Sequence, residues 1–184
     1  MTSFLLVDKI KNSLDSADTV AFGGPVKYPG GIVQHVQKTY ETQSTTTSTS
    51  YVELFTQTIT PKFSTSKIYV NLLIFADHAN YYSGGIRVLR GSTILKSGQS
   101  GTASIVVRTG SFNTANSQAY IAHPWTFKYM DSPATTSQLT YKVQYQTGSA
   151  SYPTSVNRSV NRVQQSNSDD AGYLTVLDLY EVAQ

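Results

Sequence analysis

The most informative segment of the sequence is Ile68-Tyr69-Val70-Asn71-Leu72-Leu73-Ile74-Phe75-Ala76. It is rich in branched and aromatic residues, which pack well on the pleated surface of a strand. Successive side chains of a strand point to opposite faces, and this stretch is apolar on both of them. A strand with one face in water would not have this composition. The stretch therefore predicts a strand at the centre of a sheet or at a subunit interface.

Strand patterns continue on both sides of this stretch. Between residues 139 and 146, Leu, Tyr, Val and Tyr alternate with Thr, Lys, Gln and Gln, which predicts one buried and one wetter face. The predicted strands cover residues 32–42, 51–60, 67–76, 85–95, 103–109, 118–130, 138–146, 156–163 and 172–182. The Ser/Thr tract 45–50 is either a polar loop or the end of a strand. This spacing predicts an all-β fold, an antiparallel, jelly-roll-like β-sandwich of about 8–10 strands over residues 31–184.

Composition agrees with one main domain of this kind. The chain has 184 residues, 39% of them hydrophobic and only 14% charged, with 13 Tyr and 7 Phe. It has no Cys, which excludes disulfides and thiolate metal sites. Between His78 and Ser168, eight basic residues face one acid, Asp131. This stretch could favour an anionic partner such as an acidic glycan, a lipid head group or nucleic acid. Isolated cations are more typical of solvated strand positions, which is the interpretation we favour.

The first 30 residues differ from the rest of the chain. Residues 12–31 are rich in turn formers, and they follow a short apolar segment made of Phe4, Leu5, Leu6, Val7 and Ile10. We expect an extended N-terminal arm and linker over residues 1–30, although the apolar spacing also allows a short helix. The segment lacks the basic flank of a secretory signal, and no run is long enough to span a membrane. We therefore expect synthesis in a cytoplasm without membrane insertion.

The last predicted strand repeats the composition of the central one. Apolar residues occupy both of its faces, and only Asp178 and Glu181 interrupt them. A solitary sandwich that closes on one face of each strand leaves the second apolar face uncovered. We interpret the two such strands as a sign of oligomerisation.

No pattern indicates catalysis. His35, His78 and His123 lack ligand spacing, although three copies of one histidine on a symmetry axis remain a less favoured metal site. The carboxylates Glu41, Glu53, Asp77 and Asp178 could converge only through the fold. There is no Gly-x-Ser-x-Gly elbow and no phosphate-binding glycine loop. We predict no catalytic residue, no metal and no cofactor.

Three loops are candidates for recognition. The first follows the central strand, and a polar loop at 113–118 is another. The third, at 148–154, contains Tyr152. Tyrosines at loop tips stack on sugars or pack on neighbouring subunits, and both roles stay open. The candidate ligand-binding residues are His78, Asn80, Tyr81, Tyr82 and Tyr152. Trp125, in contrast, alternates with Phe127 and Tyr129 and is predicted to lie in a buried row.

Several of these segments resemble proteins of tailed bacteriophage particles. Leu6-Val7-Asp8-Lys9-Ile10-Lys11-Asn12-Ser13 looks like the short motif that opens many phage fibre and structural proteins. The start of the phage fibre head domain is similar to Gly30–Gln37, to Ser50-Tyr51-Val52 with the tract before it, and to Ile59–Ile68. Later hallmarks of that domain resemble Phe127–Thr136, Thr140–Gln144, Asn157-Arg158-Ser159 and Leu174–Val182.

This resemblance implies a virion protein with a C-terminal trimeric head like those of the complement and tumour-necrosis-factor proteins. The expected function is that of a short head or tail fibre, or a knob, which contributes to host attachment without catalysis. The arm would join the homotrimer to other virion proteins such as capsid, portal, tail or fibre proteins. Because the arm is short where typical fibres have a long shaft, a decoration or cement protein without a receptor role is the alternative. A depolymerase is disfavoured, and a host glycan or protein ligand stays open.

Overall fold

The computed structural model describes residues 28–78, 83–95, 103–108, 122–159 and 173–184. The described residues contain no helix, and the predicted all-β antiparallel sandwich is confirmed. Its strands are β1 Ile32–Tyr40, β2 Ser44–Thr46, β3 Val52–Ile59, β4 Lys67–His78, β5 Ser83–Arg90, β6 Thr93–Leu95, β7 Ile105–Arg108, β8 His123–Asp131, β9 Leu139–Gln146, β10 Thr154–Val156 and β11 Thr175–Val182. Within this part of the chain, no helix is long and apolar enough to cross a membrane.

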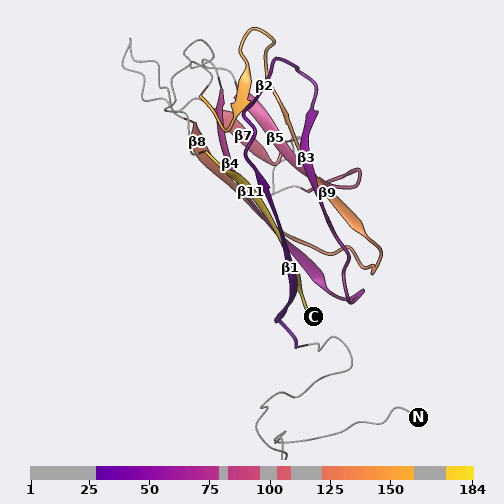
Figure 1. Ribbon diagram of the computed structural model, residues 1–184. Helices are drawn as coiled ribbons and strands as arrows, with labels where there is room; N and C mark the ends of the chain where they lie inside the picture. The colour runs from indigo at the N-terminus through magenta and orange to yellow at the C-terminus, as the bar shows by residue number, and fades with distance from the viewer. Residues whose placement is uncertain (1–27, 79–82, 96–102, 109–121, 160–172) are drawn as a thin grey trace, which may run out of the picture.

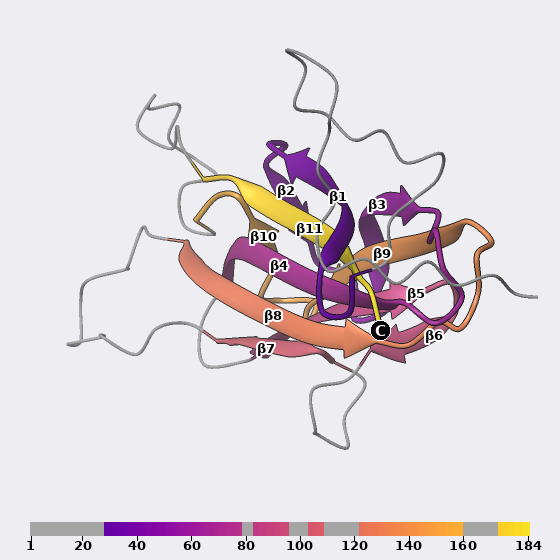
Figure 2. The ribbon, with the colours of Figure 1, turned by 90° about the horizontal axis from the view of Figure 1, so that it is seen from below.

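The strands form two antiparallel sheets (Figure 1). Sheet A has the order β1-β11-β4-β10-β2, and β8 pairs with the other edge of β4. Sheet B has the order β3-β9-β5-β6, and β7 also pairs with β5. The chain passes repeatedly from one sheet to the other, as in jelly-roll folds, so that neighbours in a sheet are distant in sequence. Seen from below, the sheets curl toward each other, and β8 of sheet A lies close to β7 of sheet B (Figure 2).

The core lies between the sheets and is centred on β4. Every second residue of this strand, from Ile68 to Ala76, is completely buried. Leu177 and Leu179 extend this layer on β11, and Tyr141 and Val143 of β9 face it from sheet B. Since β4 pairs with β11 on one side and with β8 on the other, its predicted central position is confirmed.

A buried polar network joins the two sheets at one end of this core. Asp131 of β8 accepts hydrogen bonds from Arg90 Nη1 at 2.6 Å and from the Tyr141 hydroxyl at 2.7 Å. Tyr141 is fully buried and Asp131 nearly so. Burial and the adjacent carboxylate raise the pKa of Tyr141 far above its ordinary value. The network therefore consists of a phenol, a carboxylate and a guanidinium that link sheet A to two strands of sheet B.

Two predicted strands differ from the structure. The strand expected at 85–95 is a hairpin, because Gly91 has a φ of 58° and reverses the chain between β5 and β6. The strand expected at 156–163 is shorter and begins earlier. After β10, Asn157 adopts a φ of 56° and donates from Nδ2 to Tyr40 O at 2.7 Å. Residues 160–163 lie outside the described residues.

Other predictions agree more closely with the structure. The Ser/Thr tract forms the short strand β2 and then a loop. Trp125 is half-buried in one inward row with Phe127 and Tyr129, as predicted, and its Nε1 donates to Ala76 O at 3.3 Å. The other strands begin and end within about three residues of their predicted bounds wherever the structure describes them, and residues 109, 118–121 and 172 of the predicted strands lie outside the described residues.

Candidate functional site

The outward faces of the two sheets differ in chemistry. On β4 and β11, the residues that alternate with the core point away from sheet B, and none of Tyr69, Leu73, Phe75 and Tyr180 is fully buried. Beside them, Ile32 of β1 and Met130 of β8 are 64% and 45% exposed. The surplus apolar residues of the two predicted strands thus lie next to each other on one surface, which we call the outer face of sheet A.

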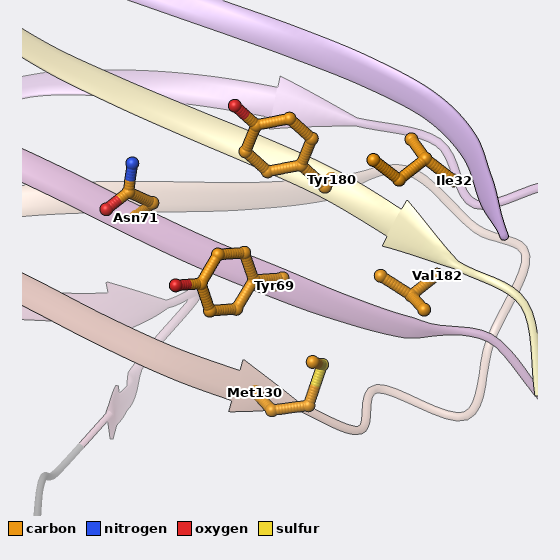
Figure 3. A pocket seen from close by; sticks show the side chains of 6 residues that line it. All are labelled: Ile32, Tyr69, Asn71, Met130, Tyr180 and Val182. Carbon is orange, nitrogen blue, oxygen red and sulfur yellow. The ribbon is translucent and has the colours of Figure 1, made fainter. Parts of the chain in front are cut away.

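An aromatic row crosses this face from edge to edge. It runs through direct cross-strand partners in the order His35, Tyr180, Tyr69 and Met130. The rings of His35 and Tyr180 stack with centroids 4.3 Å apart and planes within 8°, and Tyr69 lies 6.1 Å from Tyr180. Figure 3 shows the shallow pocket at this row, which is lined by Ile32, Tyr69, Asn71, Met130, Tyr180 and Val182. Large, flat side chains at an accessible surface are typical of protein and ligand contacts.

A polar row lies next to the aromatic row. Its cross-strand order is Gln37, Asp178, Asn71 and Lys128. The Asp178 carboxylate accepts from Gln37 Nε2 at 2.9 Å and from Asn71 Nδ2 at 3.3 Å, and His35 Nε2 lies 2.8 Å from its Oδ1. Asp178 is only 8% exposed although it points outward. Its neighbours therefore hold it in one orientation, and Lys128 marks the end of the row.

The outward face of sheet B is polar. Arg87 lies over the ring of Tyr51, 4.0 Å from its centroid, and donates from Nε to Gln144 Oε1 at 2.7 Å. Lys142 Nζ is 3.9 Å from Glu53 Oε2, a long ion pair between exposed groups. These side chains pair with one another along the surface. This face is therefore suited to contact with water, in contrast to the outer face of sheet A.

The structure corrects the predicted position of His78. It is the last residue of β4 and is completely buried, so it is not at an accessible loop tip. His78 Nδ1 lies 2.8 Å from Thr154 Oγ1, and that hydroxyl donates to Gln146 O at 3.0 Å. Thr154 therefore accepts from the imidazole, which places a proton on Nδ1. Burial lowers the pKa of His78 and favours the neutral ring.

Of the other predicted binding residues, the structure describes only Tyr152. Asn80, Tyr81 and Tyr82 lie outside the described residues. Tyr152 is half-buried in the turn after β9, where its N–H donates to Ser149 O at 2.9 Å. Its carbonyl accepts from the Thr147 hydroxyl. The turn is thus held by its own hydrogen bonds, and the role of Tyr152 in binding stays a prediction.

Buried carboxylates in the described part of the chain are engaged in internal contacts. Asp77 accepts from His78 N and from Ser159 Oγ. Glu181 is fully buried and accepts from the backbone N–H groups of Lys62 and Phe63, at 2.8 and 3.0 Å. The described residues include no group of three or more metal-ligating side chains that could hold an ion. These acids therefore serve as acceptors for backbone and side-chain donors.

The arm joins the sandwich at the same end as the C-terminus. Gly30 N donates to Ala183 O at 2.8 Å, and Ala183 N donates to Gly31 O at 2.9 Å. In Figure 1 the turn between β9 and β10 lies at the opposite end of the molecule. The predicted docking residues, Phe4, Leu5, Leu6, Val7 and Ile10, lie outside the described residues. The chain therefore enters β1 beside Ile32 and Val182, at one end of the shallow pocket.

Sequence reasoning identified part of this surface. The two-sided composition of β4 and β11 was visible, but the contributions of Met130, Lys128 and His35 depend on pairings between distant strands. The fold and the site together define an all-β antiparallel sandwich with one polar and one largely apolar outer face. No protein-family model and no curated protein matches the sequence.

Proposed function

We propose that this chain is a non-catalytic structural protein of a tailed-phage particle, a homotrimeric short fibre or knob that contributes to host attachment. The apolar outer face of sheet A carries this proposal. Monomeric proteins rarely leave a contiguous apolar face in water, and such faces commonly belong to interfaces. Three copies that turn this face toward a common axis would remove Tyr69, Tyr180 and Met130 from water together.

The size of the face suits such an assembly. Four strands about 4.8 Å apart and about eight residues long span on the order of 19 by 26 Å, or about 500 Å² in projection. Accessible area exceeds projected area, and a standard interface buries about 800 Å² on each partner. The face is therefore comparable with a stable contact between copies, while the polar face of sheet B would remain in water.

The two ends of the sandwich suit different partners. The arm enters beside the C-terminus, and the turn that holds Tyr152 lies at the far end (Figure 1). An arm that binds capsid, portal, tail or fibre proteins would leave this far end pointing away from the particle. Three copies of each outward loop would then bind a host glycan or protein multivalently, which strengthens weak individual contacts.

Two measurements on a tailed phage that carries this gene would test the proposed function. Antibody against the purified chain is expected to label projections on the particle in electron microscopy, and an unlabelled particle would overturn the virion assignment. The purified chain is also expected to adsorb to host cells and to compete with infection. Absence of adsorption, with particles that lose stability when the gene is deleted, would favour a cement protein instead.

A further inference from the structure

We infer that the contact between copies is head-to-tail, with Lys128 and Met130 of one copy on Asp178 and Tyr180 of the next. This inference rests on the proposed assembly through the outer face of sheet A and specifies how the copies meet. It concerns the register and the charge pairing of that contact. Two neighbouring rows of side chains on the same strands support it.

The first observation is the electrostatic situation of Asp178. The carboxylate is held by the amides of Gln37 and Asn71 and by His35, whose side chain is 39% exposed. A second copy that covers this face removes the remaining water from the carboxylate. Losing this water disfavours the charged carboxylate, since its present partners are two neutral amides and an imidazole. A cation from the covering copy would offset this loss.

The second observation is the position of Lys128. It points outward from β8, is exposed, and lies at the end of the polar row that contains Asp178. Among the described residues, Arg90 pairs with Asp131 and Lys142 lies near Glu53, but no carboxylate lies within ion-pair distance of this lysine. Two strand spacings, about 10 Å, separate it from Asp178 of its own chain. Each copy thus presents a cation and a carboxylate at separate places on one face.

The aromatic row repeats the spacing of the polar row. Met130 and Tyr180 lie two strands apart in the aromatic row, and Lys128 and Asp178 lie two strands apart in the polar row. A second copy that faces this surface with its strands in the same direction, and with its β11 over β8 of the first copy, therefore forms both pairs at once. A methionine sulfur on an aromatic ring is a favourable contact. The charge pair and the apolar pair require the same displacement.

The direction of the strands limits the symmetry of the assembly. Strands of all copies point the same way only when the rotation axis runs along the strands. A twofold axis of this kind would form the contact between β8 and β11 twice between the same two copies, whereas the threefold axis of the proposed function forms it once between each copy and the next and closes a ring. Covalent trimers, which a twofold pair cannot give, distinguish the two arrangements.

Introduced cysteines test the register directly, since the chain has none of its own. In the variant with both Met130→Cys and Tyr180→Cys, the two sites of one chain are about 10 Å apart, too far for an intramolecular disulfide. Mild oxidation of the full chain is expected to give covalent dimers and covalent trimers on a non-reducing gel. Chains with one of the two substitutions cannot form covalent trimers.

Sheet B offers a matched control. Val106 and Gln146 also occupy one cross-strand row, two strands apart on the outward face. The variant with both Val106→Cys and Gln146→Cys is expected to stay monomeric on the gel. If the unmodified chain is oligomeric in sedimentation but the first variant cross-links no better than this control, the register is wrong while the proposed assembly stands. A monomeric unmodified chain would overturn the assembly itself.

A charge reversal tests the ion pair separately. Lys128→Glu would place a carboxylate against Asp178 of the neighbour, and the dissociation constant of the oligomer is expected to rise about tenfold or more. Lys142→Glu, on the outward face of sheet B, is expected to change it by less than about threefold. Equal effects of the two substitutions would overturn the pairing of Lys128 with Asp178.

Discussion

Tyr69 and Tyr180 are direct cross-strand partners at the centre of sheet A, with ring centroids 6.1 Å apart, on the face that points away from sheet B. Both follow the same alternation that buries Ile68 and Leu179 completely. The relationship explains why two strands are apolar on both faces. One face of each strand supplies the core of the chain, and the other is available to a neighbour.

Tyr69→Lys is expected to weaken the oligomer without unfolding the chain. Central aromatic residues of interfaces contribute about 2 kcal/mol or more, so the dissociation constant should rise about thirtyfold. The measurement is sedimentation equilibrium, with circular dichroism to confirm the fold. Thr58→Lys on the outward face of sheet B is the control, and an equal effect of both substitutions would argue against the sheet A contact.

Glu181 is expected to make the stability of the chain fall in acid. Burial alone would raise its pKa, but backbone donors at Lys62 and Phe63 and the side chains of Gln34 and Ser66 outweigh this and lower it below 4.5. A lowered pKa in the folded state means that this contribution is complete above the unfolded value and is lost as pH falls through the folded value. Chemical denaturation across this pH window measures the loss.

The matched variants are Glu181→Gln and Glu53→Gln. The first removes a charged acceptor of several donors and is expected to cost about 2–3 kcal/mol at neutral pH. It should also reduce the loss of stability below pH 4.5. Glu53, which is half exposed in a long ion pair, should show little effect. An unchanged acid profile in Glu181→Gln would show that other acids control it.

Tyr141→Phe is expected to destabilise the sandwich by about 1–3 kcal/mol, because it leaves a buried oxygen of Asp131 without its 2.7 Å donor. Urea denaturation gives the difference. Tyr129 is a suitable comparison, since its hydroxyl has no hydrogen bond to the described residues and its ring is half-buried. A cost for Tyr129→Phe as large as that for Tyr141→Phe would contradict a specific role of the network.

Gly91→Ala is expected to cost about 1–2 kcal/mol although a methyl group there meets no atom within 4 Å. The cost comes from the backbone, whose φ of 58° is unfavourable for residues with a side chain. Gly91→Asn should cost less, because asparagine tolerates this region better. Thermal unfolding of the unmodified chain and the two variants provides the comparison. If Gly91→Ala does not lower the stability, the turn between β5 and β6 has changed its backbone conformation to accept alanine.

The sequence predicted the sheet-forming segments well because alternation is a local property. It predicts that Ile68–Ala76 lies at the centre of a sheet or at a subunit interface, because a strand with one face in water would not be apolar on both faces. It does not predict the hairpin at Gly91, since one glycine inside an apolar run is also compatible with a continuous strand. It also predicts that the central strand ends before His78, because polar residues favour a loop, whereas in the fold His78 Nδ1 lies 2.8 Å from Thr154 Oγ1 and the side chain is buried.

The candidate surface was harder to predict for a related reason. The excess of apolar residues on β4 and β11 was evident, but their neighbours come from strands far away in sequence. Lys128 and Met130 join the surface only through the pairing of β8 with β4, and His35 only through that of β1 with β11. Composition shows that a second face needs covering, whereas register decides which side chains form it.

Sedimentation velocity of the full chain, diluted in steps to micromolar concentration, determines whether the outer face of sheet A joins copies of the chain. Assembly through the outer face of sheet A predicts a species of three times the 20.1 kDa chain mass that persists on dilution. A folded, stable monomer throughout the series would contradict it, since the apolar face would then be tolerated in water without a partner.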